Sequence, residues 1–267
     1  MTVTIARGLA VGAVLLFALS GCAASGVAST PEPTAADGAL PQGSDPVQLD
    51  PASFSTTIDN PYWPMVPGTR WTYRETDGNG DELVVTVVVT TETKLLANGI
   101  TARVVRDTVT RNGEIIEDTF DWYAQDAEGA IWYLGEDTAE FEAGVIVSTH
   151  GSFEAGVDGA LPGIAVPAAP RAGMAYRQEY YAGEAEDNGE VLSTRLIADT
   201  PFGSFTKVLL TLDTITIEPG IAQLKFYAPG VGPVLILDAG GGAGREELIS
   251  VDTVPAGTGT GPLGSQD

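Results

Sequence analysis

The fold of this chain is decided by the stretch Thr101-Ala102-Arg103-Val104-Val105-Arg106-Asp107-Thr108-Val109-Thr110-Arg111-Asn112-Gly113-Glu114-Ile115-Ile116-Glu117-Asp118-Thr119-Phe120-Asp121-Trp122-Tyr123-Ala124-Gln125. Two runs rich in β-branched and aromatic residues flank an Asn-Gly pair, which suits the positive φ angles of a type I′ turn. The stretch therefore predicts an antiparallel hairpin in which Arg111 opposes Glu114.

Extending this register along both strands places three pairs on one face of the sheet: Val109 with Ile116, Val105 with Phe120, and Arg103 with Trp122. On the other face Arg106 opposes Thr119, with Glu117 and Asp121 as diagonal neighbours. We expect that second face to be the wetter one.

Period-two runs of valine, threonine, isoleucine and aromatic residues recur along the chain, while no convincing apolar repeat of helical period is present. We expect strands at 69–76, 83–93, 99–110, 115–125, 130–134, 138–142, 145–150, 174–182, 190–199, 206–217, 221–228, 233–238 and 245–252. Short connections favour antiparallel neighbours, and open sheet edges are a liability. The prediction is an all-β fold, a single large antiparallel curved sheet or partly closed β-barrel with little helix.

The N-terminus carries the four residues Leu19-Ser20-Gly21-Cys22 at the end of an apolar run that follows Arg7. A basic start, about a dozen apolar residues and a small-residue cleavage site are typical of a secretory leader. The run is shorter than the roughly 20 residues that cross a bilayer. We expect residues 1–21 to be removed and Cys22 to carry lipid.

This leader resembles the signal of bacterial lipoproteins, in which the cysteine is thioether-linked to diacylglycerol with palmitate-type chains. Two chains on one residue anchor firmly, so the resemblance implies an extracytoplasmic protein held at the bacterial cell membrane by Cys22. Residues 22–50 contain hardly any large apolar side chain and are expected to form a disordered tether. The remaining plan is an all-β domain at 51–253 and a flexible tail at 254–267.

The chain is strongly acidic, with 36 Asp and Glu against 13 Lys and Arg and a net charge of −23. A negative field repels phosphate, which excludes nucleic acid as a partner. The charge suits capture of a cation or of a basic protein partner, and it also serves solubility. Cys22 is the only cysteine, so the exported domain is expected to depend on an ordinary core and not on disulfides.

Three segments of the sequence resemble segments of exported bacterial β-proteins: 60–73, 201–205 and 226–232. In such proteins a large antiparallel sheet bends around an apolar hollow, as in the outer-membrane lipoprotein carrier, whose relatives plug the hollow with helices. This sequence shows no such helix. The stretch from about 59 to 251 is also similar to one uncharacterised family of bacterial lipoproteins, through 118–126, 156–163 and 176–181. That resemblance implies a single domain and no particular mechanism.

Many kinds of catalytic site are excluded by motif. There is no phosphate-binding Gly-Lys-Ser or Gly-Lys-Thr, no Gly-x-Ser-x-Gly, no cysteine pair and no second histidine beside His150. A usual zinc site is therefore excluded, and a serine hydrolase would depend on His150. The stretch 77–81 resembles the start of a calcium loop, but Glu82 and Val88 break the pattern, so we expect a hairpin turn there.

Carboxylates supply the candidates for metal binding and hydrolysis. The predicted register sets Asp107 opposite Asp118, and such a like-charge pair calls for water, a shared proton, a hard cation or an arginine. Acidic loops could hold calcium, and the weak metal candidates are Asp107, Asp118, Glu136, Asp137, Glu154 and Asp158. A further acidic loop runs from 183 to 187. The weak candidates for a hydrolase of envelope glycans are Asp121, Glu136, Glu154 and Glu179.

Three aromatic pairs put one ring on each face of their strands: Trp122 with Tyr123, Trp132 with Tyr133, and Tyr180 with Tyr181. Half of these rings should build the core and half could line a ligand site. We expect a non-enzymatic ligand-binding or structural protein, entered at its concave face through the loop at 151–170. The alternatives are a carboxylate-dependent hydrolase and an acidic module that docks a basic protein.

Overall fold

The computed structural model describes residues 40–76 and 80–266, and it consists of strands apart from one short 3₁₀ helix, η1 (Pro51–Ser53). The first strands are β1 (Phe54–Ser55), β2 (Thr69–Thr76), β3 (Glu82–Leu95), β4 (Thr101–Arg111), β5 (Glu114–Asp126), β6 (Ile131–Glu142), β7 (Val145–Ser148) and β8 (Phe153–Glu154). The remaining strands are β9 (Leu161–Val166), β10 (Ala175–Arg177), β11 (Glu179–Tyr180), β12 (Asp187–Thr200), β13 (Gly203–Ile215), β14 (Ala222–Ala228), β15 (Gly232–Asp238) and β16 (Arg245–Thr253). Among the described residues, no helix is long and apolar enough to cross a membrane.

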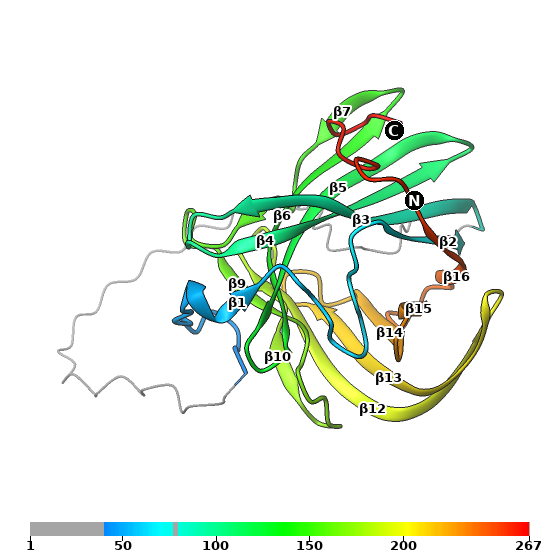
Figure 1. Cartoon of the computed structure of the whole chain (residues 1–267). Coiled ribbons are helices and arrows are strands. Elements are labelled where there is room, and N and C mark those ends of the chain that lie inside the picture. Colours follow the sequence, from blue (N-terminus) through cyan, green and yellow to red (C-terminus); the bar gives the residue numbers. More distant parts are fainter. Residues whose placement is uncertain (1–39, 77–79, 267) are drawn as a thin grey trace, which may run out of the picture.

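All sixteen strands belong to one antiparallel sheet, which curves until it is nearly closed into a barrel (Figure 1). The order is β10-β12-β13-β14-β15-β16-β2-β3-β4-β5-β6-β9-β11, with β1, β7 and β8 as short additions to β5 and β6. Every register is antiparallel, as the short connections predict. The expectation of an all-β curved sheet or partly closed barrel is confirmed.

The two ends of the sheet meet where β10 runs into β11. Residues of β10 pair with β12, while residues of β11 pair with β9, so one short segment spans the seam. The Arg177 guanidinium lies in this seam, fully buried, and donates to the carbonyl oxygens of Pro162, Gly43 and Asp45 at 2.6–3.1 Å. Burial lowers the pKa of Arg177. The seam is thus held through backbone carbonyls and not through an ion pair.

The β4–β5 hairpin begins in the predicted register and then departs from it. Arg111 opposes Glu114 and Thr110 opposes Ile115, but an irregularity then shifts the pairing, and Val109 opposes Glu117. A bulge of this kind inserts one residue in one strand. The predicted register beyond the bulge is wrong by one residue, including all three pairs predicted for one face of the sheet.

This shift changes which residues share a face, because side chains alternate along a strand. Thr119 opposes Asp107 and not Arg106, which pairs with Phe120. Asp118 opposes Thr108, so the predicted pairing of Asp107 with Asp118 is wrong. Arg106 and Asp118 lie on the outer face of the barrel, buried to 3% and 0% exposure.

The C-terminal segment covers this outer face. Residues 254–266 follow β16 across β3–β5 (Figure 1), and Asp118 Oδ2 accepts hydrogen bonds from Gly264 N at 2.7 Å and from Arg106 Nη2 at 2.7 Å. Arg106 Nη2 also donates to the Ser265 carbonyl at 2.9 Å. The sequence predicts a flexible tail at 254–267. In the structure residues 254–266 instead lie on the sheet, where their backbone groups are hydrogen-bond partners of buried polar side chains.

The N-terminal end of the described chain also differs from the expected tether. Leu40, Val47 and Leu49 pack against the core, and Arg177 binds the backbone at Gly43 and Asp45. The leader, Cys22 and the first part of the tether lie outside the described residues, as do 77–79 of the loop that resembles a calcium site.

Most expected strands agree with the observed ones, and the differences lie at β1, at β6 and between residues 151 and 182. β6 runs through what the sequence divides into two strands, and the segment expected at 174–182 is divided between β10 and β11. The short strand β8 and β9 lie inside the expected loop. The sequence does not predict β9 because it contains Pro162 and Gly163, and proline and glycine weaken a strand pattern.

Candidate functional site

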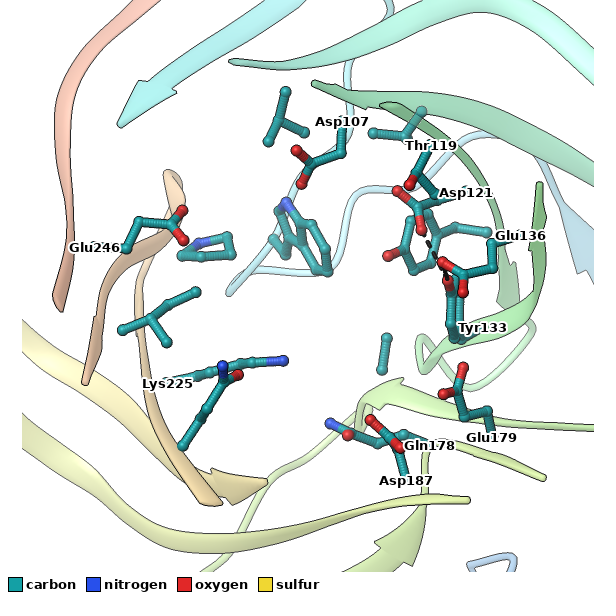
Figure 2. Close-up of a pocket in the computed structure, with 18 of the residues that line it drawn as sticks. Asp107, Thr119, Asp121, Tyr133, Glu136, Gln178, Glu179, Asp187, Lys225 and Glu246 are labelled. Atoms are coloured by element: carbon teal, nitrogen blue, oxygen red, sulfur yellow. Dashed lines mark hydrogen bonds between the residues drawn. The ribbon is translucent and has the colours of Figure 1, made fainter. Parts of the chain in front are cut away.

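The curved sheet surrounds a cavity of about 190 Å³ that is partly open to solvent, drawn in Figure 2. Alternation along β5 puts Glu117, Thr119, Asp121 and Tyr123 on the face that lines it. The rest of the lining comes from β2, β3, β4, β6, β9, β11, β12, β14, β15 and β16 and from Trp63, which precedes β2. Residues scattered over most of the chain are thus brought to one site.

Carboxyl groups dominate this lining. The seven acidic side chains are Asp107, Glu117, Asp121, Glu136, Glu179, Asp187 and Glu246, against Lys225 as the single basic residue. Lys225 Nζ lies 2.9 Å from Asp213 Oδ2, which also accepts a hydrogen bond from Gln178. Burial lowers the pKa of Lys225, but the charges of Asp213, Asp187 and Glu246 outweigh it and raise that pKa.

Tyr133 lies between two of these acids. Its hydroxyl oxygen is 2.8 Å from Asp121 Oδ1 and 2.9 Å from Glu136 Oε2 (Figure 2). A phenol has one proton to donate, so both contacts are attractive only when one of the two carboxyl groups is protonated. Burial raises the pKa of Glu136 well above its ordinary value, and the charge of Asp121 raises it further, against the hydrogen bond of Tyr133.

Glu179 and Asp187 are a second pair of carboxyl groups in the lining (Figure 2). Burial raises the pKa of Asp187 to about 7, an effect that Lys225 opposes. Burial and the charge of Asp187 raise the pKa of Glu179 well above its ordinary value. The cavity therefore holds protons on carboxyl groups close to neutral pH.

These raised pKa values predict that the folded protein loses stability as the pH rises from about 5 to about 7.5. Over that range Glu136, Glu179 and Asp187 keep protons in the folded state that the unfolded chain has already lost, so the unfolding free energy falls with pH. Circular dichroism should show a melting temperature that decreases across this range, with a shallower slope in Glu136→Gln.

Asp137 provides the matched control, because it follows Glu136 on β6 and is exposed on the opposite side. The Asp137→Asn variant should keep the wild-type slope. A melting temperature that rises with pH in the wild type, or an equal slope in Glu136→Gln, would contradict this assignment of protons.

Aromatic rings form the other part of the lining. Tyr123 and Tyr133 stack with centroids 5.0 Å apart, and Trp63 contacts Tyr123 at 5.3 Å and Tyr227 at 6.0 Å. Tyr123 and Tyr227 are 8% and 3% exposed. Buried polar groups normally have a hydrogen-bond partner, and the indole Nε1 of Trp63 is buried without one among the described residues.

The residues predicted as site candidates fall into several groups. Six of them line the cavity: Asp107, Asp121, Tyr123, Tyr133, Glu136 and Glu179. A second, more open hollow outside Glu136 is lined by Trp122, Asp137, Glu154, Asp158 and Tyr181. Tyr180 lines neither hollow.

The second hollow has its own cation. Lys94 Nζ lies 3.2 Å from the centroid of the Trp122 ring and 2.8 Å from Glu154 Oε2. Partial burial raises the pKa of Glu154, but the contact with Lys94 outweighs it and lowers that pKa. Trp132 donates to Asp126 at 2.8 Å, and His150 Nε2 is 3.0 Å from Glu184 Oε2. These positions are structural pairs away from the cavity.

Among the described residues, no three side chains of His, Cys, Asp or Glu are placed to hold one metal ion together. Of the weak metal candidates, Asp118 binds Arg106 and Glu154 binds Lys94. An arginine compensates Asp118, one of the four possibilities that its predicted pairing left open.

Sequence reasoning missed Trp63, Lys225, Tyr227 and Glu246 in the cavity wall. One signal for two of them was available, because Gln223, Lys225 and Tyr227 alternate with apolar residues along β14. Alternation identifies a shared face but does not say whether it points outward or into the barrel. The curvature of the sheet decides that direction.

No family model matches this chain and no curated protein is similar to it. Two solved structures are similar at 12% identity: a protein inferred to be exported, with a YmcC-like fold, from Bacteroides fragilis, and a protein inferred to be a lipoprotein, from Parabacteroides distasonis. Each covers 72% of this chain and 99% and 98% of its own, with TM-scores of 0.42 and 0.40.

Proposed function

We propose that this chain is an extracytoplasmic protein, anchored to the bacterial cell membrane by lipidated Cys22, that binds a small ligand inside its barrel. The observation that supports binding is the cavity, whose wall combines aromatic rings and seven carboxyl groups. Ligand sites typically are concave and partly apolar, with a few polar groups that fix orientation.

The size of the cavity points to a small ligand. A cavity of about 150 Å³ holds benzene, which has six heavy atoms, and this one measures about 190 Å³. A ligand of about six to ten heavy atoms suits that space.

Hydrolysis of glycans is the weaker alternative for the same cavity. Asp121 and Glu136 are a carboxyl pair with one raised pKa, as in a glycosidase. The hydroxyl of Tyr133 lies between the two groups and bonds to both, so it occupies the space that a glycosidic bond would need. Binding without chemistry therefore fits the geometry better.

Native mass spectrometry of the full chain, extracted from its own membranes in mild detergent, tests the proposal. We expect a diacylglycerol mass on Cys22 and a retained small mass that Ala165→Leu loses, because Ala165 lines the cavity and leucine would fill part of it. Val145→Leu, at a site 64% exposed on β7, is the control and should keep the mass. A free Cys22 would refute the anchor, and an empty wild-type protein would refute the ligand.

A further inference from the structure

We infer that the end of the β12–β13 hairpin, residues 195–207, rests on the surface of the membrane and holds the barrel against it. This inference goes beyond ligand binding, and it rests on the proposed lipid anchor at Cys22. It combines three observations: the apolar side chains exposed at this hairpin tip, the charges beside them, and the reach of the chain that leads to Cys22.

The β12–β13 tip stands out from the rest of the sheet. Strand β13 pairs with β14 only over Leu209–Thr214, so residues 203–207 pair with β12 alone among the described strands (Figure 1). The amide of Phe202, in the turn, donates to the Leu248 carbonyl oxygen of β16 at 3.2 Å. The Phe202 ring stacks on Phe205 with centroids 6.3 Å apart, and Phe205 packs against the core. The turn is therefore held in place from inside the barrel.

Large apolar side chains are exposed together at this tip. Ile197 is 67% exposed and Phe202 is 43% exposed. Ile249 is also exposed, and it follows Leu248, the residue that holds the turn. Taking about 200 Å² for a large apolar side chain, these three expose roughly 300 Å². Apolar patches of about this size on a monomer are often functional.

The charge of the tip is opposite in sign to that of the whole chain. Arg195 and Lys207 are exposed, and neither forms an ion pair with another described residue. Asp199 is the single acid in the segment, so two basic residues minus one acidic residue give +1, in a chain of −23. Basic residues are attracted to anionic lipid headgroups, while the acidic remainder of the barrel is repelled by them. Charge therefore turns this face of the barrel, and not another, toward phospholipid.

A lipid surface suits this tip better than a protein partner does. The tip is a convex turn with roughly 300 Å² of exposed apolar side chains, whereas a stable protein interface buries about 800 Å² on each partner. A fluid headgroup layer can close around a narrow turn, and aromatic and aliphatic side chains beside basic residues are typical of this boundary.

The anchor keeps the membrane within reach of the tip. The described chain begins at Leu40, 18 positions after Cys22 (40 minus 22). A segment of that length spans at most about 60 Å. The anchor thus holds the barrel near the bilayer without selecting the face that meets it, and the apolar side chains and charges of the tip make that selection.

Nitroxide labelling of the full acylated chain in vesicles tests the contact, because Cys22 is the only cysteine and lipid blocks its thiol. A label on Ser204→Cys reports on the tip, since Ser204 is exposed beside the turn. A label on Val145→Cys reports on the opposite rim, because β6 runs antiparallel to β12 in the order of the sheet. In vesicles of equal parts phosphatidylglycerol and phosphatidylethanolamine, we expect the label at 204 to be protected from a water-soluble nickel chelate and to collide with oxygen dissolved in the membrane. The label at 145 should stay accessible to the chelate.

Removal of the apolar side chains provides the second arm. Phe202→Ser combined with Ile197→Ser should abolish the protection at 204, because the apolar contact is lost while the anchor stays. Val147→Ser, which removes an exposed apolar side chain from β7, is the matched control and should keep the protection. Melting temperatures check that each variant is folded.

The outcomes separate this contact from the anchor on which it rests. Full access of the chelate to 204, in a chain whose Cys22 is acylated by mass spectrometry, would overturn the contact and leave the anchor. Protection of 204 from chelate and oxygen alike would also overturn it, since protein and not lipid would then cover the tip. Protection that survives in the double variant would overturn the role of the apolar side chains and with it the inference. An unacylated Cys22 would overturn the anchor and the contact together.

Discussion

Replacing Asp118 by alanine should lower the unfolding free energy by about 3–5 kcal/mol, because it leaves the Arg106 guanidinium buried without its carboxylate. Asp118 is fully buried and accepts four hydrogen bonds, two from Arg106 at 2.9 and 2.7 Å, one from Thr108 and one from Gly264. The substitution breaks the contact of the sheet with the C-terminal segment as well. Urea unfolding followed by tryptophan fluorescence measures the loss.

An exposed ion pair in the same barrel provides the control. Arg70 and Asp252 lie 3.3 Å apart with side chains 39% and 45% exposed, and such pairs contribute about 0–1 kcal/mol. Asp252→Ala should therefore be nearly neutral. A loss below about 1 kcal/mol for Asp118→Ala as well would mean that water replaces the lost carboxylate and that the segment 254–266 does not seal this face.

Replacing Gly163 by alanine should destabilise the barrel by about 3 kcal/mol, at the upper end of the usual cost of overpacking. A Cβ atom on Gly163 would lie 2.3 Å from the Arg177 carbonyl oxygen and 2.4 Å from that of Gln178. Both obstacles are backbone atoms of the seam, which cannot rotate away as a side chain can. The strand β9 must move from the β10–β11 segment, and the seam opens.

Hydrogen exchange localises this effect. The amide of Gln178, which donates to the Asp187 carbonyl at 2.8 Å, should exchange faster in Gly163→Ala. Gly220→Ala is the control, since a Cβ there meets nothing within 4 Å, and its stability should change by no more than about 0.5 kcal/mol. Unchanged exchange at Gln178 would show that the seam tolerates the methyl group.

The local sequence pattern was sufficient to predict the strands, but it was insufficient to predict the register in which they pair. The Asn112-Gly113 turn and the first two pairs of the β4–β5 hairpin follow from the sequence, because turn chemistry acts over a few residues. Beyond Thr110 the register shifts by one residue, and the outer face there contacts the C-terminal segment. Such contacts join residues more than a hundred positions apart.

The sequence predicted which residue types form the candidate site, but only in part which of these residues lie together. Asp121, Glu136 and Glu179 were candidates as carboxylates, and they do share one cavity. Glu154 was a candidate on the same ground, and it lies outside with Lys94. Lys225, Tyr227 and Glu246 come from strands that the sequence identifies but cannot orient.

The sequence by itself determined the all-β class, the antiparallel order of neighbours, the acidic charge and the lipoprotein-like leader, because each depends on local pattern or composition. Only the tertiary structure decided which face of each strand became the inside. Closure of the sheet at the β10–β11 seam sets that direction, and a register shift of one residue exchanges the two faces. For that reason the acidic residues of the inner face line the cavity, while Arg106 and Asp118 of the outer face form a buried ion pair beneath the C-terminal segment.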